Sequence, residues 1–215
     1  MFSDIYDRYA SGELTRKETV QALGEQLPAY FFNGVVPSGG VALTDAGKTA
    51  TATVRLEPGT YAMECYVKTP QGTWHTDRGM LKELTVTEAQ NGAEAPEADV
   101  TLTLSNYEIG VEGQFSAGEQ TVAVRVTENP DGLMMHDVNL VRLDGGLPVD
   151  SVVGWMDWMD PAQFRSPAPG ANIGGLEHLT AGRTGYFTAD LQPGSYALVS
   201  EVYGSRGMVH EFSVQ

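Results

Sequence analysis

Cysteine and basic residues are scarce in this sequence. Its 215 residues include one cysteine, Cys65, which cannot form an intrachain disulfide, and there is no C-x-x-C pair for zinc or redox chemistry. Only 13 Lys and Arg residues stand against 28 Asp and Glu residues, which gives a formal net charge of −15. Because a chain this acidic repels polyanions, we expect no nucleic-acid partner.

Long apolar runs and enzyme signatures are also missing. No run approaches the length of a membrane span, and the N-terminal MFSDIYDRYA lacks the basic and apolar regions of a signal peptide. There is no G-x-S-x-G, no H-E-x-x-H and no glycine-rich phosphate loop, and the four histidines are scattered. We therefore expect a protein that is not an enzyme.

Turn formers and β formers are plentiful. The sequence has 25 Gly and 11 Pro and only 19% charged residues, which is typical of a β-rich chain with many turns. One helix is expected near the N-terminus, where Thr15 and Glu18 form a capping box and Pro28 is expected to end the helix. A second, short helix is expected over 149–159. The predicted class is therefore all-β with short helices in the connections.

Hydrophobic residues alternate along several segments, which predicts strands. These segments are 50–56, 61–67, 81–87, 100–104, 122–126 and 136–140. Residues 88–98 are rich in Ala, Glu and Pro and have no periodic apolar face, so we interpret them as an acidic linker. This predicts a partial domain at 1–87 and a second domain at 99–215.

The chain contains an internal repeat. Residues 39–67 align without gaps with residues 174–202 at an offset of 135, with 12 identities in 29 positions. Residues 78–86 align with 206–214 at an offset of 128, so the second copy has lost seven residues between its last two strands. The repeat predicts two copies of one β-domain.

Each copy carries part of a recognisable pattern. A strand that starts at P-G-x-Y and ends at Cys is followed by a His and a Met in one loop; the residues are Pro58, Gly59, Tyr61, Cys65, His75 and Met80. This pattern resembles the cupredoxin family. The resemblance implies Greek-key β-sandwiches and a type 1 copper held by an upstream His and then by Cys, His and Met.

The resemblance also implies that both ligand sets are incomplete. The second copy keeps His136, in the phrase MMHDV, and Met208, but it has Ser200 where the first copy has Cys65. Its deletion is expected to remove the counterpart of His75. The first copy keeps Cys65, His75 and Met80 but has no upstream strand to carry the first His.

Each candidate site has a structural alternative. Cys65, His75 and Met80 offer the soft donors that copper prefers, or they are a buried thiol, a loop imidazole and a packing thioether. His136 with its neighbouring methionines and Met208 offers a Cu(I) site, or it is a relic in the core. We expect no cofactor, with copper as the one alternative. The remaining histidines, His178 and His210, match no family ligand and are expected at the surface or satisfied within the core.

Residues 97–136 of the second copy have no counterpart before Met1. The first domain is therefore expected to lack its N-terminal strands, with the open edge covered by upstream residues or by a second subunit in a homo-oligomer. We expect a truncated start and, because cupredoxin-like proteins are usually exported, a periplasmic or extracellular location.

The sequence favours an exported, noncatalytic, tandem cupredoxin-like binding or structural protein with degenerate metal sites. Its partner would be an unidentified protein or small ligand. One alternative is a copper-binding electron-transfer or carrier protein that uses Cys65, His75 and Met80. Another is an adhesion-type β-sandwich with an aromatic patch near Trp155 and Trp158.

Overall fold

The computed structural model describes residues 2–33, 35–88, 92–129, 135–157, 160 and 162–215. Eleven strands dominate it: β1 (Thr51–Val54), β2 (Gly59–Glu64), β3 (Leu81–Val86), β4 (Val100–Ser105), β5 (Glu108–Glu112), β6 (Gly118–Glu128), β7 (His136–Arg142), β8 (Ala171–Leu179), β9 (Thr184–Leu191), β10 (Gly194–Val199) and β11 (Val209–Val214). The helices are α1 (Phe2–Ala10), α2 (Arg16–Asn33) and α3 (Val149–Met156). The all-β class is confirmed.

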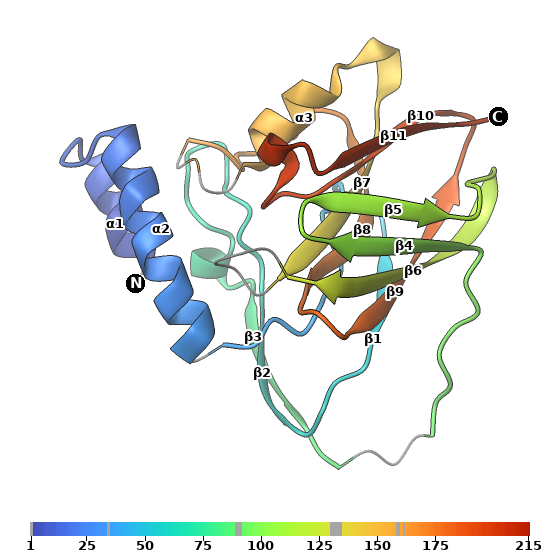
Figure 1. Cartoon of the computed structure of the whole chain (residues 1–215). Helices are drawn as coiled ribbons and strands as arrows, with labels where there is room; N and C mark the ends of the chain where they lie inside the picture. The colour runs from blue at the N-terminus through green and yellow to red at the C-terminus, as the bar shows by residue number, and fades with distance from the viewer. Residues whose placement is uncertain (1, 34, 89–91, 130–134, 158–159, 161) are drawn as a thin grey trace.

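Two sheets pack face to face, in the orders β1-β9-β6-β4-β5 and β11-β10-β7-β8 (Figure 1). Strand β8 pairs with β7 and contacts β9 at the edge of the sandwich, so these three strands are neighbours in space as they are in sequence. The next strand, β10, returns to pair with the other side of β7. The spatial order β10-β7-β8-β9 is that of a Greek key. The expected Greek-key sandwich is therefore confirmed.

The alternation that predicts the strands also builds the core. On β4, Val100, Leu102 and Leu104 are fully buried between the sheets, whereas the intervening Thr101 and Thr103 are half-buried. Each such buried aliphatic side chain stabilises the fold by roughly 1.5–3 kcal/mol relative to exposure. The sandwich of residues 100–214 is thus held together by ordinary hydrophobic burial.

Some residues that the sequence repeat aligns pair with each other in the structure. Val41 pairs with Leu176 in an isolated antiparallel bridge, and Ala52 on β1 pairs with Phe187 on β9. Each pair joins residues that the repeat aligns, because 41 + 135 = 176 and 52 + 135 = 187. Antiparallel pairing of equivalent residues places an approximate local twofold axis at each of these two pairs.

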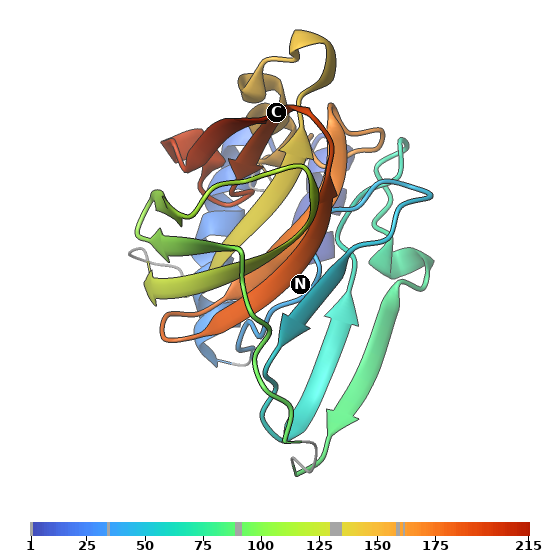
Figure 2. The ribbon, with the colours of Figure 1, turned by 90° about the vertical axis from the view of Figure 1, so that its right-hand side faces the viewer.

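The first copy is far less enclosed than the second. Strand β10 pairs with β7 as well as with β11, so this pair of strands belongs to a larger sheet. Their counterparts β2 and β3 pair only with each other among the described residues. Figure 2 shows this hairpin, in cyan and green, set apart from the sandwich. The division at 88–98 stays a prediction, although β1 joins the sheet of the second copy.

The N-terminal helices pack on loops beside the sandwich (Figure 1). Thr15 and Glu18 form the expected capping box, with the Thr15 hydroxyl 2.7 Å from Glu18 Oε2. Helix α2 continues to Asn33, so the prediction that Pro28 ends it is wrong, since a proline removes one backbone hydrogen bond and a helix can continue past it with a kink. No helix in the described ranges is long and apolar enough to cross a membrane.

Helix α3 confirms the expected short helix as far as Met156; residues 158 and 159 lie outside the described ranges.

Candidate metal centres

One end of the sandwich gathers the residues of the second copy that the cupredoxin resemblance places at ligand positions. His136 begins β7, Ser200 follows β10, and Tyr203 and Met208 lie in the loop before β11. All four are buried. The His136 and Tyr203 rings lie 5.5 Å apart, and the amide of Met208 donates to the carbonyl of Tyr203 at 3.2 Å. The fold therefore brings these positions together.

The His136 ring has a defined orientation. Its Nε2 lies 2.9 Å from the carbonyl oxygen of Glu128, which can only accept, so Nε2 carries the proton and Nδ1 carries the lone pair. Nδ1 is buried and has no hydrogen-bond partner among the described residues. Burial lowers the pKa of the imidazole, which keeps it neutral. His136 thus keeps a nitrogen lone pair in the core that could bind a metal.

Tyr203 occupies the place of His75. In both copies a 3₁₀ turn, Thr76–Arg78 or Gly204–Arg206, ends at a left-handed glycine, and the next Met amide donates to the carbonyl of His75 or Tyr203. Cys65 precedes His75 by ten residues and Ser200 precedes Tyr203 by three, a difference of seven. The expectation that the deletion removes the counterpart of His75 is therefore wrong: the deletion lies before that position, and a tyrosine fills it.

Ser200 is held by a buried carboxylate. Its hydroxyl donates to Asp137 Oδ1 at 2.8 Å, and the amide of Glu201 donates to Asp137 Oδ2 at 2.7 Å. Asn139 also donates to Asp137 Oδ2. The second copy therefore has a hydroxyl, already hydrogen-bonded, where a type 1 centre needs a thiolate, and these residues do not fit blue copper.

The first copy brings two of its three candidate ligands together. Cys65 Sγ lies 3.6 Å from Nδ1 of His75, and both residues are half-buried. Met80 is tied to the pair through its backbone, since its carbonyl accepts from the Cys65 amide, but its side chain is exposed. Burial raises the pKa of the Cys65 thiol. These residues offer one thiol and one imidazole, and metal binding there stays a prediction.

Two of the methionines near His136 lie in the core. Met135 and Met208 are fully buried in the main core, which suits space-filling side chains. Met134 lies outside the described residues. A Cu(I) site at His136 and Met208 stays a prediction.

A second cluster was missed by sequence reasoning. We call Tyr66, Glu177, His178 and Glu201 the Tyr66 cluster. The Tyr66 hydroxyl lies 2.7 Å from Glu177 Oε2 and 2.6 Å from Glu201 Oε1, and His178 Nε2 lies 3.0 Å from Glu201 Oε1 and 3.7 Å from Glu177 Oε2. The sequence signal was present, since Glu177 and His178 are polar neighbours inside a strand, and Glu201 aligns with Tyr66 in the repeat.

Burial sets the charge state of this cluster. Removal from water, together with the neighbouring carboxylates, raises the pKa of Glu201 well above its usual range. The pKa of Glu177 is also raised, mainly by burial and then by repulsion from Glu201. The pKa of the Tyr66 phenol is raised by the same causes. The cluster therefore favours proton sharing or a bound cation.

Two other features of the sequence have clear structural roles. The Trp155 indole donates to the carbonyl of Arg165 at 2.7 Å and its ring packs on Phe164, so it faces the protein's own chain. Trp158 lies outside the described residues. His210 is half-buried on β11, with its ring 6.4 Å from that of Phe212.

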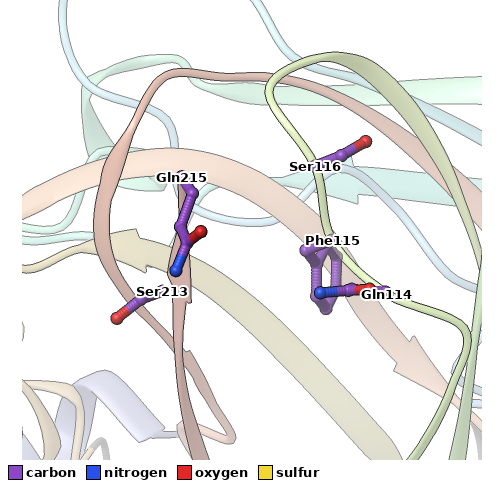
Figure 3. A pocket seen from close by; sticks show the side chains of 5 residues that line it. All are labelled: Gln114, Phe115, Ser116, Ser213 and Gln215. Atoms are coloured by element: carbon purple, nitrogen blue, oxygen red, sulfur yellow. The ribbon is translucent and has the colours of Figure 1, made fainter.

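A pocket of about 300 Å³ lies between the segment before β6 and the C-terminal strand (Figure 3). Two amides, two hydroxyls and one aromatic ring line it: Gln114, Ser116, Ser213, Gln215 and Phe115. None of these five side chains is an acid or a base.

Comparison with known proteins gives matches among solved structures only. No protein-family model matches the sequence, and no curated protein is significantly similar to it. Among the matching structures is a dithionite-reduced auracyanin from the photosynthetic bacterium Roseiflexus castenholzii, with 17% identity and a TM-score of 0.41, covering 54% of this chain and 94% of that chain.

Two further matches are similar. An azurin from the obligate methylotroph Methylomonas sp. strain J has 16% identity and a TM-score of 0.39, covering 54% of this chain and 94% of its own. Auracyanin B has 18% identity and a TM-score of 0.39, covering 57% of this chain and 92% of its own. Each of the three matches covers about half of this chain and more than nine tenths of the matched chain.

Proposed function

We propose that this protein is a noncatalytic, exported binding or structural module of cupredoxin-like fold whose copper sites have lost ligands. One observation carries the proposal: Ser200 and Tyr203 stand where the family places a thiolate and an imidazole, at the same end of the sandwich as His136 and Met208. Neutral hydroxyl groups are poor ligands for copper compared with thiolate and imidazole. The second copy keeps the scaffold of a copper centre without its chemistry.

The test is to restore the two missing ligands. In full-length protein carrying Cys65→Ser, Cu(II) should give no intense thiolate-to-copper absorption. Ser200→Cys combined with Tyr203→His in that background should create the band, because His136 Nδ1 already lies bare in the core. An intense band in the Cys65→Ser protein with Ser200 and Tyr203 intact would contradict the proposal.

A copper-carrier function is the second candidate, and the 3.6 Å approach of Cys65 Sγ to His75 Nδ1 favours it. Soft donors suit Cu(I), and an exposed Met80 could complete the set. Stoichiometric Cu(I) in the purified protein, lost on Cys65→Ser and retained on Ser200→Ala, would establish this function in place of the first. Ser200→Ala is the matched control because it changes the repeat-equivalent residue.

The binding surface is proposed to lie on the β2–β3 hairpin, with a second copy of this chain as its partner. Within the described residues β2 has a free edge, and Met63, Met80 and Leu81 are each more than half exposed around it. Because equivalent edges of the two repeat copies already pair within the chain, β2 edges of two chains can pair in the same antiparallel way.

Sedimentation equilibrium would test this interface. We expect a dimer that Met63→Lys on β2 dissociates, because a buried lysine at the paired edge opposes association. Lys48→Met, at an exposed position directly after the turn at 46–47 and outside β2 and β3, serves as the control. A monomeric wild-type protein at high concentration would refute the proposed interface.

A further inference from the structure

We propose that the Tyr66 cluster binds one divalent cation of the zinc type, held by Glu177, His178 and Glu201. This site is separate from the proposed copper relics, since it uses none of Cys65, His75, Met80, His136 and Met208. It joins the two repeat copies. Tyr66 follows β2, Glu177 and His178 lie on β8, and Glu201 follows β10.

The spacing of the donor atoms suits a small ion. One donor atom from each of the three side chains lies within 4.8 Å of the others. His178 Nε2 is 3.0 Å from Glu201 Oε1 and 3.7 Å from Glu177 Oε2. Ligands at zinc-type distances of about 2.0–2.1 Å in a tetrahedron are separated by about 3.3 Å. The observed separations bracket that value, so an ion requires little movement of the side chains.

A buried oxygen without a partner points independently to a missing ligand. The Glu201 side chain is 0% exposed, and its Oε2 has no hydrogen-bond partner among the described residues. The ion pairs of Glu177 and Glu201 in the described chain are both with His178. Buried carboxylates are ordinarily paired or metal-bound, and one imidazole cannot balance two of them together with nearby Asp137.

The Tyr66 hydroxyl is well placed to orient both carboxylates. It carries one proton and lies at hydrogen-bond distance from two carboxyl groups, so it can donate to only one of them. Without an ion the other short contact needs a carboxyl proton, and a bound cation takes the place of that proton. Tyr66 is therefore a positioning residue, and it acts on the metal through its ligands.

The donor set selects the class of ion. One imidazole nitrogen and two carboxylate oxygens suit Zn²⁺ and similar divalent transition metals. Calcium prefers six to eight oxygen ligands, which three side chains cannot supply. The side chains of Glu177 and His178 keep some contact with solvent, since they are 13% and 18% exposed. A solvent molecule can fill the fourth position there.

The test is Zn²⁺ binding by the full-length, chelator-treated protein, followed by calorimetry. We expect one Zn²⁺ per chain in wild type, loss of stoichiometric binding in His178→Ala, and affinity reduced about 10- to 100-fold in Tyr66→Phe, as for removal of a group that orients ligands. His210→Ala is the matched control, because His210 is a half-buried strand histidine outside the cluster. It should bind as wild type does.

Cobalt provides a second measurement, because His178 would affect the spectrum of bound Co²⁺ only if it were a metal ligand. Co²⁺ in the wild-type protein should give the visible absorption of a tetrahedral site, and His178→Ala should remove it. The proposal fails if no stoichiometric Zn²⁺ binds, or if binding survives His178→Ala. It also fails if Cys65→Ser abolishes binding, since the ion would then lie at the thiol. Circular dichroism of each variant verifies that it is folded.

Discussion

Two equivalent tyrosines offer a matched test of how unequally the repeat copies are enclosed. Tyr196 is 1% exposed, and its hydroxyl donates to the Gln192 carbonyl at 2.6 Å and accepts from the Gln192 amide at 3.0 Å. Tyr61, 135 residues earlier, makes the corresponding bond to the Glu57 carbonyl at 2.6 Å, but it lies on the open hairpin. The same substitution, Tyr→Phe, removes the same hydroxyl in two environments.

The expected losses differ. Tyr196→Phe removes two hydrogen bonds at a buried hydroxyl, which destabilises the protein by about 1–3 kcal/mol. At Tyr61 water replaces the lost partner, so the free energy of unfolding should change by less than about 0.5 kcal/mol. The ring contacts of Tyr196 with Phe212 remain in the variant, so packing does not contribute.

Urea unfolding measures the difference as a shift in midpoint at constant m value. Equal losses at the two positions, or a larger loss in Tyr61→Phe, would refute the conclusion that the first copy is the more open one. A change in m in either variant would show that the denatured or native state has changed, and would remove that variant from the comparison.

Three further predictions concern stability. Burial lowers the pKa of His136 in the folded protein, so the unfolded state binds the proton at a higher pH than the folded state does. The free energy of unfolding should therefore fall as the pH drops below about 6.5. His136→Gln should remove this pH dependence when unfolding is measured at several pH values. Thr15→Ala should lower the free energy of unfolding by about 1 kcal/mol, because it removes the cap of α2. If the variant loses its helical signal on heating at the same temperature as the wild type, the prediction is wrong. Gly175→Ala should abolish folding, since its Cβ would lie 2.1 Å from the Val138 carbonyl oxygen. At Gly182 an added Cβ meets no atom within 4 Å, so Gly182→Ala should only add backbone strain. Circular dichroism should show a folded protein for Gly182→Ala and an unfolded one for Gly175→Ala.

The fold was largely predictable because burial alternates along the strands. Val100, Leu102 and Leu104 recur with a period of two in the sequence, and these are the residues that the structure buries. Of the glycines that the repeat aligns, Gly47 and Gly182 lie in turns, whereas Gly174 and Gly175 lie inside β8. Local chemistry sufficed for the cap at Thr15 as well. Each of these features depends on residues close in sequence, where pattern and structure are directly linked.

The sites were harder to predict because they depend on contacts between distant residues. Extending the offset of 128 by three residues from Arg78 pairs His75 with Tyr203, and the backbone hydrogen bonds around both residues confirm that pairing. The Tyr66 cluster joins residues up to 135 positions apart. No periodicity within a strand carries information about such a contact.

The pairing of equivalent residues also sets the order in which the protein can fold. Residues 38–54 make their sheet hydrogen bonds with residues 173–188, so during synthesis the N-terminal segment must wait for most of the chain before its partners exist. Contacts of such large sequence separation slow folding and leave strand edges exposed meanwhile. The sandwich of residues 100–214 is therefore expected to form first, and the earlier part of the chain to dock onto it last.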